Sequence, residues 1–136
     1  MNEFALIGAP NVGKTTLFNA LTGKQARTGN YAGVTVGIRS ANIKGTHAQL
    51  YDLPGIYSLS SYSLEEKTAA DFIRLRTDCL FVHVAAAANL SRALSFTREL
   101  AARGRTVLVL SMYDEFTRRG GKLDLPAPPR EFVVHA

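Results

Sequence analysis

The sequence has little of what marks secreted, membrane-spanning or metal-binding proteins. Its one cysteine, Cys79, has no partner for an internal disulfide, which agrees with a reducing compartment. It has no run of about eighteen apolar residues, and its start at Met1 lacks the basic and apolar stretches of a signal peptide. We therefore expect a cytosolic chain in which Cys79 is a buried structural residue.

Histidines are also few, and neither they nor the aromatic residues are arranged for binding. The three histidines, His47, His83 and His135, have no carboxylate or thiol partners at ligand spacing, so we expect no iron site in this chain. The net charge is +5, but no aromatic side chains are interleaved with the arginines. We expect a solvated basic face and no nucleic-acid partner.

What the sequence does have is a regular alternation of strand-like and helical segments. Its 136 residues, 46% of them hydrophobic, suit a single domain over residues 1–136. Helices are predicted before Gly23, over 64–76 and from Asn89 to Gly104, and strands over 4–7, 36–44, 47–53, 79–85, 106–110 and 132–134. This alternation predicts an α/β fold with a doubly wound, mostly parallel, six-stranded sheet, whose ligand lies at the carboxyl ends of the strands.

Two connections between these segments have a predicted structure of their own, a hairpin and a mobile loop. Gly45-Thr46 separates two strand-like runs and indicates a hairpin, which supplies one antiparallel strand. Residues 23–34 are small and polar without either period, so we expect a mobile loop there.

The first apolar run leads directly into a complete phosphate loop. Its glycines allow backbone N–H groups to converge on a β-phosphate, Lys14 reaches the β and γ oxygens, and the Thr15 hydroxyl ligates magnesium. The loop comprises Gly8, Ala9, Pro10, Asn11, Val12, Gly13, Lys14 and Thr15, followed by Thr16. Its place between a strand and a helix predicts that the chain binds a nucleoside triphosphate.

A second motif, Asp52-Leu53-Pro54-Gly55, ends the predicted strand 47–53. There a carboxylate holds magnesium through water, and the Gly55 N–H faces the γ-phosphate. Thr35, in Gly33-Val34-Thr35-Val36, closes the preceding loop, where its hydroxyl would complete the magnesium shell.

A third motif, Ser111-Met112-Tyr113-Asp114, follows the strand at 106–110. The Asp114 carboxylate accepts hydrogen bonds from N1–H and the exocyclic amine of guanine, a pair of donors that adenine does not present. The motif predicts selection of GTP and GDP.

Together these residues resemble a known family. The runs GAPNVGKTTLFNALTG, GNYAGVTV and DLPGIYSLSSYSLEE, with the spacing to Asp114, are similar to the N-terminal G domain of the bacterial ferrous-iron transporter B family, within the Ras-like GTPases. The resemblance spans residues 3 to about 124. It implies a Ras-like fold, GTP, Mg²⁺ and a switch domain joined to an iron-transporting membrane part at the cytoplasmic face of the inner membrane.

The resemblance also implies slow, potassium-assisted hydrolysis. Asn11 resembles the cation-ligating asparagine of the family, with backbone carbonyls near Gly29 and Tyr31 completing the K⁺ site. Ile56 follows Gly55 and has no hydrogen-bonding side chain to orient a water. We therefore assign catalysis to a set of four residues, Asn11, Lys14, Thr35 and Gly55.

The chain departs from the family pattern on the guanine side. Ser111 replaces an asparagine and is too short to bridge the base and the phosphate loop in the same way, so we expect weaker nucleotide binding. Ala86 replaces an aspartate, and His135-Ala136 stands where a Ser-Ala pair touches the base.

The final helix that covers the last strand in this family is expected to be missing, as in a truncated or abbreviated relative. We therefore expect self-association, with a homodimer formed through the uncovered sheet face or an exchanged element.

Two alternatives remain open at this point. The altered guanine motif is also compatible with a pseudo-GTPase, a nucleotide-sensing module with negligible hydrolysis. The positive charge is compatible with an Era-like ribosome-assembly GTPase, although no RNA-binding appendage is visible in the sequence.

Overall fold

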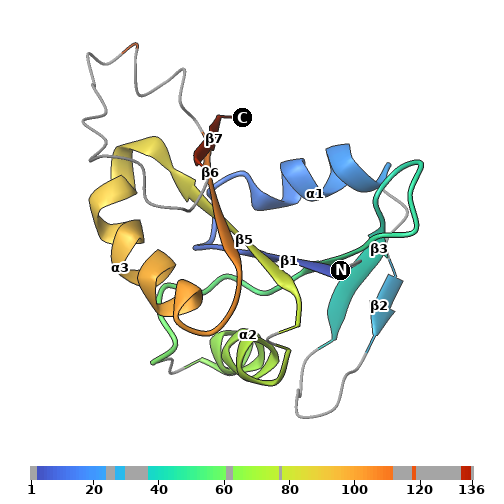
Figure 1. Cartoon of the computed structure of the whole chain (residues 1–136), viewed down its shortest axis with the longest axis horizontal. Helices are drawn as coiled ribbons and strands as arrows, with labels where there is room; N and C mark the ends of the chain where they lie inside the picture. Colours follow the sequence, from blue (N-terminus) through green and yellow to red (C-terminus); the bar gives the residue numbers. More distant parts are fainter. Residues whose placement is uncertain are drawn as a thin grey trace.

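One mixed β-sheet organises the chain (Figure 1). The computed structural model describes residues 3–23, 27–29, 37–60, 63–76, 78–111, 118 and 133–135. Within these residues seven strands pair in the order β2-β3-β4-β1-β5-β6-β7. The strands are β1 (Glu3–Ile7), β2 (Arg27–Gly29), β3 (Ile38–Asn42), β4 (Gln49–Asp52), β5 (Leu80–Ala86), β6 (Thr106–Ser111) and β7 (Val133–His135). The helices are α1 (Lys14–Thr22), α2 (Leu64–Leu75) and α3 (Leu90–Ala101), the last preceded by the 3₁₀ turn η1 (Ala87–Asn89).

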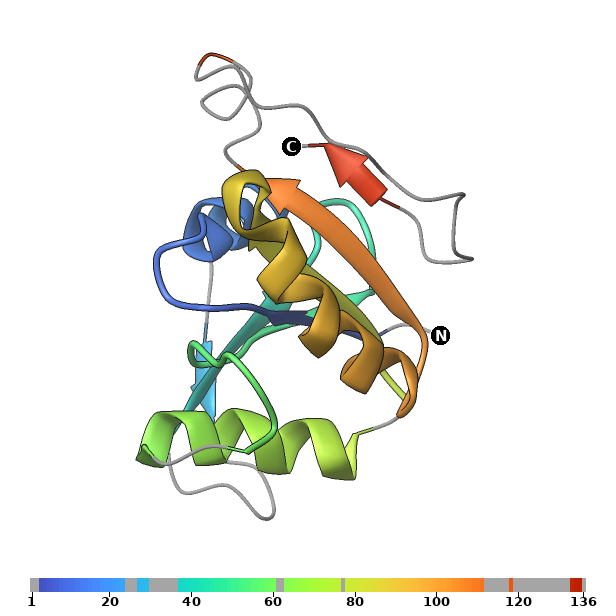
Figure 2. The ribbon, with the colours of Figure 1, turned by 90° about the vertical axis from the view of Figure 1, so that its left-hand side faces the viewer.

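The strand directions confirm a mostly parallel sheet with one antiparallel strand. β1 pairs in parallel with β4 and β5, and β5, β6 and β7 continue in parallel, as Figure 2 shows for the last two. Only β3 among the described strands runs the other way, antiparallel to β2 and β4. Because β2–β4 lie on one side of β1 and β5–β7 on the other, the chain after β1 emerges at the switch point of the sheet, where ligands bind in open α/β folds.

The number of strands differs from the prediction. The expected six strands are present, and a seventh, β2, lies inside the segment 23–34 that we predicted to be a loop. Its three residues pair with β3 through Arg27↔Ser40, Thr28↔Arg39 and Gly29↔Ile38. Such a short strand has no periodicity of its own to detect, because it is formed by pairing with the edge that β3 offers.

Two layers of apolar side chains hold the helices on opposite faces of the sheet. Along β1, Ala5 and Ile7 belong to one cluster, which includes Phe72 of α2 and Leu100 of α3. Leu6, between them, packs into a second cluster with Phe18 of α1. This alternation places α1 on one face and α2 and α3 on the other, as Figure 1 shows.

The helix ends follow local sequence signals, with one exception. Gly23 ends α1 in a left-handed conformation (φ 73°), and the Ser63 side chain accepts a hydrogen bond from the Glu66 N–H at the start of α2. Asn89 precedes α3 as predicted, but its side chain makes no capping hydrogen bond, because the turn of η1 runs directly into the helix. None of the described helices is long and apolar enough to cross a lipid bilayer.

The core on the α2 face gives a test of the fold. Ile73 is fully buried, whereas Leu75 on the same helix is 59% exposed. We expect Ile73→Ala to lower the free energy of unfolding by about 2–5 kcal/mol through lost burial and the cavity left behind. Leu75→Ala, the matched control, should change it by less than about 0.5 kcal/mol. Urea denaturation measures both, and equal effects of the two substitutions would contradict the assigned packing.

Candidate functional site

The phosphate loop lies at the carboxyl end of β1 and leads into α1. Asn11 and Gly13 take positive φ values of 64° and 86°, and α1 begins at Lys14. No side chain caps the start of this helix, and its first turn has no acidic residue. The first N–H groups of α1 therefore keep their capacity to bind an anion.

Close backbone approaches fix the loop against its neighbours. A Cβ atom added at Gly8 would lie 2.4 Å from the Val84 carbonyl oxygen on β5, and one added at Gly55 would lie 2.6 Å from the Pro10 Cγ. The Ile56 N–H donates to the Gly8 carbonyl at 2.9 Å. The phosphate loop and the Asp52–Gly55 motif are thus in direct contact, and neither glycine has room for a side chain.

Lys14 and Asp52 form the central ion pair of the site. Lys14 Nζ lies 2.5 Å from Asp52 Oδ1 and donates to the Leu53 carbonyl at 2.7 Å. The side chains are 11% and 6% exposed. Removal of one member of a buried pair leaves the other charge uncompensated, so each side chain constrains the other.

Arg39 is a third charged residue at the site that we did not predict. Its Nη1 lies 3.6 Å from Asp52 Oδ2, its Nη2 donates to Asn19 Oδ1 at 3.4 Å, and its guanidinium lies 4.9 Å from the centre of the Phe18 ring. The β3–β4 register pairs Arg39 with Asp52. Counting the same number of residues back and forward from the predicted Gly45-Thr46 turn gives the same pair. The position of Arg39 beside Asp52 could therefore have been predicted from the sequence.

A cavity of about 480 Å³ opens beside Lys14. Its walls are polar and consist of the phosphate loop, the start of α1 and Gly55. The lining residues are Ala9, Pro10, Asn11, Gly13, Lys14, Thr15, Thr16 and Gly55. Uncapped N–H groups, a lysine and a nearby carboxylate form a donor set that fits a phosphate chain with its magnesium ion.

Ser111 reaches the phosphate loop from the end of β6. Its hydroxyl donates to the Val12 carbonyl oxygen and lies 3.3 Å from that of Ala85. Ser111 pairs across the sheet with Ala86, so two of the departures from the family pattern are neighbours. The serine tethers the loop because the end of β6 lies directly beside it, with the Ser111 Cβ 3.8 Å from a Cβ built at Gly13.

The structure brings the predicted residues of the loop, Asp52–Gly55 and Ser111 together. Gly29 lies in β2 and His135 in β7. The remaining predicted site residues fall outside the described part of the chain: Tyr31, Gly33, Val34, Thr35, Met112, Asp114 and Ala136.

Cys79 is buried as predicted, and burial raises the pKa of its thiol. It lies with Glu3 and Asp78 in the one cluster of potential metal ligands found among the described residues. Arg76 forms ion pairs with both carboxylates. These charges are therefore already compensated, and we assign the cluster no ligand.

A family model for the ferrous iron transport protein B matches residues 2–132. The chain belongs to the FeoB family. Its similarity extends to the Fe(2+) transporter FeoB of Staphylococcus aureus (strain COL), 38% identical over 125 residues, which are 91% of this chain and 19% of that protein. The Campylobacter jejuni transporter is 39% identical over 133 residues, 96% of this chain and 22% of that protein. The chain spans about a fifth of the length of these FeoB relatives.

Solved FeoB structures share the fold. The cytosolic domain of the T. maritima FeoB iron transporter in a GDP form is 36% identical with a TM-score of 0.80, covering 99% of this chain and 55% of that one. NFeoB from S. thermophilus bound to GDP, AlF4⁻ and K⁺ is 43% identical with a TM-score of 0.77, covering 91% and 49%. The predicted Ras-like fold is confirmed.

The Ser111 tether is testable by deletion of one oxygen atom. Ser111→Ala leaves the Val12 and Ala85 carbonyls without this donor, and we expect the free energy of unfolding to fall by about 1–3 kcal/mol. Ser91→Ala, on the exposed surface of α3, is the control and should change it by less than about 0.5 kcal/mol. Equal unfolding midpoints for both variants in urea would show that the hydroxyl does not hold the loop.

Proposed function

We propose that this chain is a GTP-binding and GTP-hydrolysing switch domain, a single G domain over residues 1–136. The observation that supports it best is the convergence of Lys14, Asp52 and Gly55 at the uncapped start of α1. The relatives with GDP in their solved structures support guanine nucleotides as the ligand.

Different residues of the site bind the phosphates, the magnesium ion and the potassium ion. The backbone N–H groups of residues 8–16, Pro10 excepted, hold the phosphates, and Lys14 neutralises them. Thr15, Thr35 and Asp52 hold Mg²⁺, and the Gly55 N–H faces the γ-phosphate. Asn11, with the carbonyls of Gly29 and Tyr31, holds K⁺, a role supported by the K⁺ in the S. thermophilus complex. When bound, the two cations supply positive charge where negative charge develops on the phosphates.

Phosphate binding requires Lys14 to change partners. In the structure its ammonium group forms an ion pair with Asp52, the same carboxylate that we assign to magnesium. A phosphate chain on the loop draws Lys14 away and frees Asp52 Oδ1 for Mg²⁺. Arg39, which lies 3.6 Å from Oδ2 in the structure, can remain there and keep Asp52 oriented in both states.

The base is held at the ends of β6 and β7. Asp114 selects guanine, with Met112 and the His135-Ala136 pair beside the base, and Ser111 positions the loop. The output of the switch is the regulation of ferrous iron uptake by the membrane part of a longer transporter, because the relatives of this chain are Fe(2+) transporters about five times its length. Its place is then the cytoplasmic face of the bacterial inner membrane. Self-association of the chain remains a prediction.

Lys14→Ala tests the phosphate site. Loss of the only lysine in the loop should weaken binding of a fluorescent GTP analogue with Mg²⁺ by at least about a hundredfold. Lys67→Ala is the control, because Lys67 is exposed and pairs with Asp71 on the surface of α2. Circular dichroism checks that both variants fold. A folded Lys14→Ala protein with wild-type affinity would overturn the site.

Asn11→Gly tests the role of K⁺ and separates a GTPase from a pseudo-GTPase. Glycine tolerates the positive φ of residue 11, so the substitution removes the carboxamide without backbone strain. We expect single-turnover GTP hydrolysis to be at least about tenfold faster in K⁺ than in Na⁺ for the wild type, and equal in both salts for the variant. Binding of GTP should change little. Negligible hydrolysis by the wild type in K⁺ would instead support the pseudo-GTPase.

A further inference from the structure

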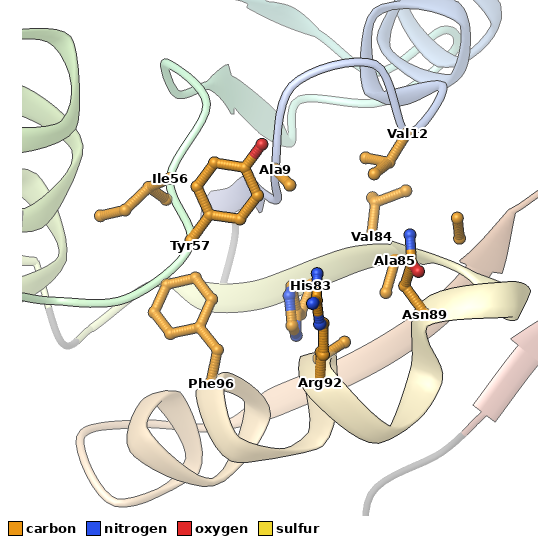
Figure 3. Close-up of a pocket in the computed structure, with 12 residues that line it drawn as sticks. Ala9, Val12, Ile56, Tyr57, His83, Val84, Ala85, Asn89, Arg92 and Phe96 are labelled. Atoms are coloured by element: carbon orange, nitrogen blue, oxygen red, sulfur yellow. The ribbon is translucent and has the colours of Figure 1, made fainter.

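A second cavity lies on the other side of the phosphate loop, between β5, α3 and the segment after Gly55 (Figure 3). It encloses about 220 Å³. Most of its wall is apolar, formed by Ala9, Val12, Val84, Ala85, Ala93 and Phe96. An apolar cavity of about 150 Å³ in a protein core binds benzene, so this one has room for a slightly larger flat ring system.

One ring nitrogen of His83, in this wall, has no hydrogen-bond partner among the described residues. His83 is 3% exposed, and its Nδ1 lies 2.7 Å from Thr97 Oγ1. Thr97 Oγ1 also lies 3.0 Å from the Ala93 carbonyl oxygen. With the hydroxyl proton directed to that carbonyl, Oγ1 accepts from His83, and we assign the ring proton to Nδ1. Burial lowers the pKa of His83 to about 4, so the ring is neutral near pH 7 and Nε2 is a bare acceptor.

Nε2 faces the cavity rather than closed packing. His83 lines the cavity, and in the described part of the chain no fully enclosed side-chain nitrogen or oxygen lacks a hydrogen bond. No described donor reaches Nε2. A molecule in the cavity that carries an N–H or O–H group would satisfy this acceptor.

A positively charged side chain, Arg92, lines the same cavity. Arg92 extends from α3 toward the lining residues, with the Asn89 carboxamide nearby (Figure 3). Arg92 forms no ion pair with a carboxylate among the described residues. The polar groups around the apolar wall therefore include the His83 acceptor and the Arg92 charge, beside the Asn89 carboxamide and Tyr57.

We propose that this cavity binds a small aromatic carboxylate that carries a ring N–H or O–H donor. The ring lies among the apolar residues, its donor reaches His83 Nε2, and the carboxylate pairs with Arg92. The proposal does not depend on the proposed nucleotide function, because the two groups that it uses, His83 and Arg92, lie on β5 and α3 and not on the phosphate loop.

Indole-3-acetate is a suitable probe, since it combines an indole N–H with a carboxylate. The chain has no tryptophan, so the fluorescence anisotropy of the probe reports binding without a protein indole signal. We expect saturable binding to the full nucleotide-free chain. 1-Methylindole-3-acetate, which lacks the donor, and tryptophol, which lacks the charge, should each bind at least about fivefold more weakly. Absence of saturable binding at millimolar probe, or equal affinity for all three compounds, would overturn the proposal.

Matched substitutions locate the probe. Ala93→Leu fills the cavity and should weaken binding at least tenfold, whereas Ala102→Leu, exposed beyond the end of α3, should not. Arg92→Gln should weaken indole-3-acetate at least fivefold and leave tryptophol unchanged, with Arg98→Gln on the same helix as control. Unchanged affinity in folded Ala93→Leu protein would place the probe elsewhere and contradict the assignment. If that variant does not fold, the Arg92 pair and the three compounds decide the question.

Discussion

The parallel pairing of β1 with β4 is the constraint on which the site depends. Its register sets Leu6 beside Asp52, and the Leu53 N–H donates to the Leu6 carbonyl at 3.2 Å. β1 and β4 therefore leave the sheet at the same edge. β1 continues into the phosphate loop, and β4 continues into the segment that ends at Gly55. A slip of this register would turn Asp52 to the other face of the sheet and separate it from Lys14.

Charge at this edge is balanced by residues from three elements. Asp52 is 8% exposed and lies between Lys14, from the start of α1, and Arg39, from β3. The antiparallel β3 therefore contributes a charge to the site as well as a strand to the sheet.

Much of this could be predicted from the sequence, because the decisive signals were local. The phosphate loop, the hairpin at Gly45-Thr46 and the stop at Gly23 each depend on a few adjacent residues, and all are present in the structure. Arg39 was missed, although counting from that hairpin would have found it. No local sequence pattern predicts β2 or the hydrogen bond from Ser111 to Val12, because each depends on segments that only the fold brings together. The cavity beside His83 is likewise a product of how α3 packs on β5.

The central claim is that the edge formed by β1 and β4 holds a guanine nucleotide with magnesium. Calorimetric titration of the wild-type chain with non-hydrolysable GTP and ATP analogues, each with Mg²⁺ and with EDTA, tests it most directly. The account predicts saturable binding of the GTP analogue that weakens when Mg²⁺ is removed, and binding of the ATP analogue at least about tenfold weaker. Equal affinities for the two analogues would contradict the guanine assignment, and no binding of either would contradict the site itself.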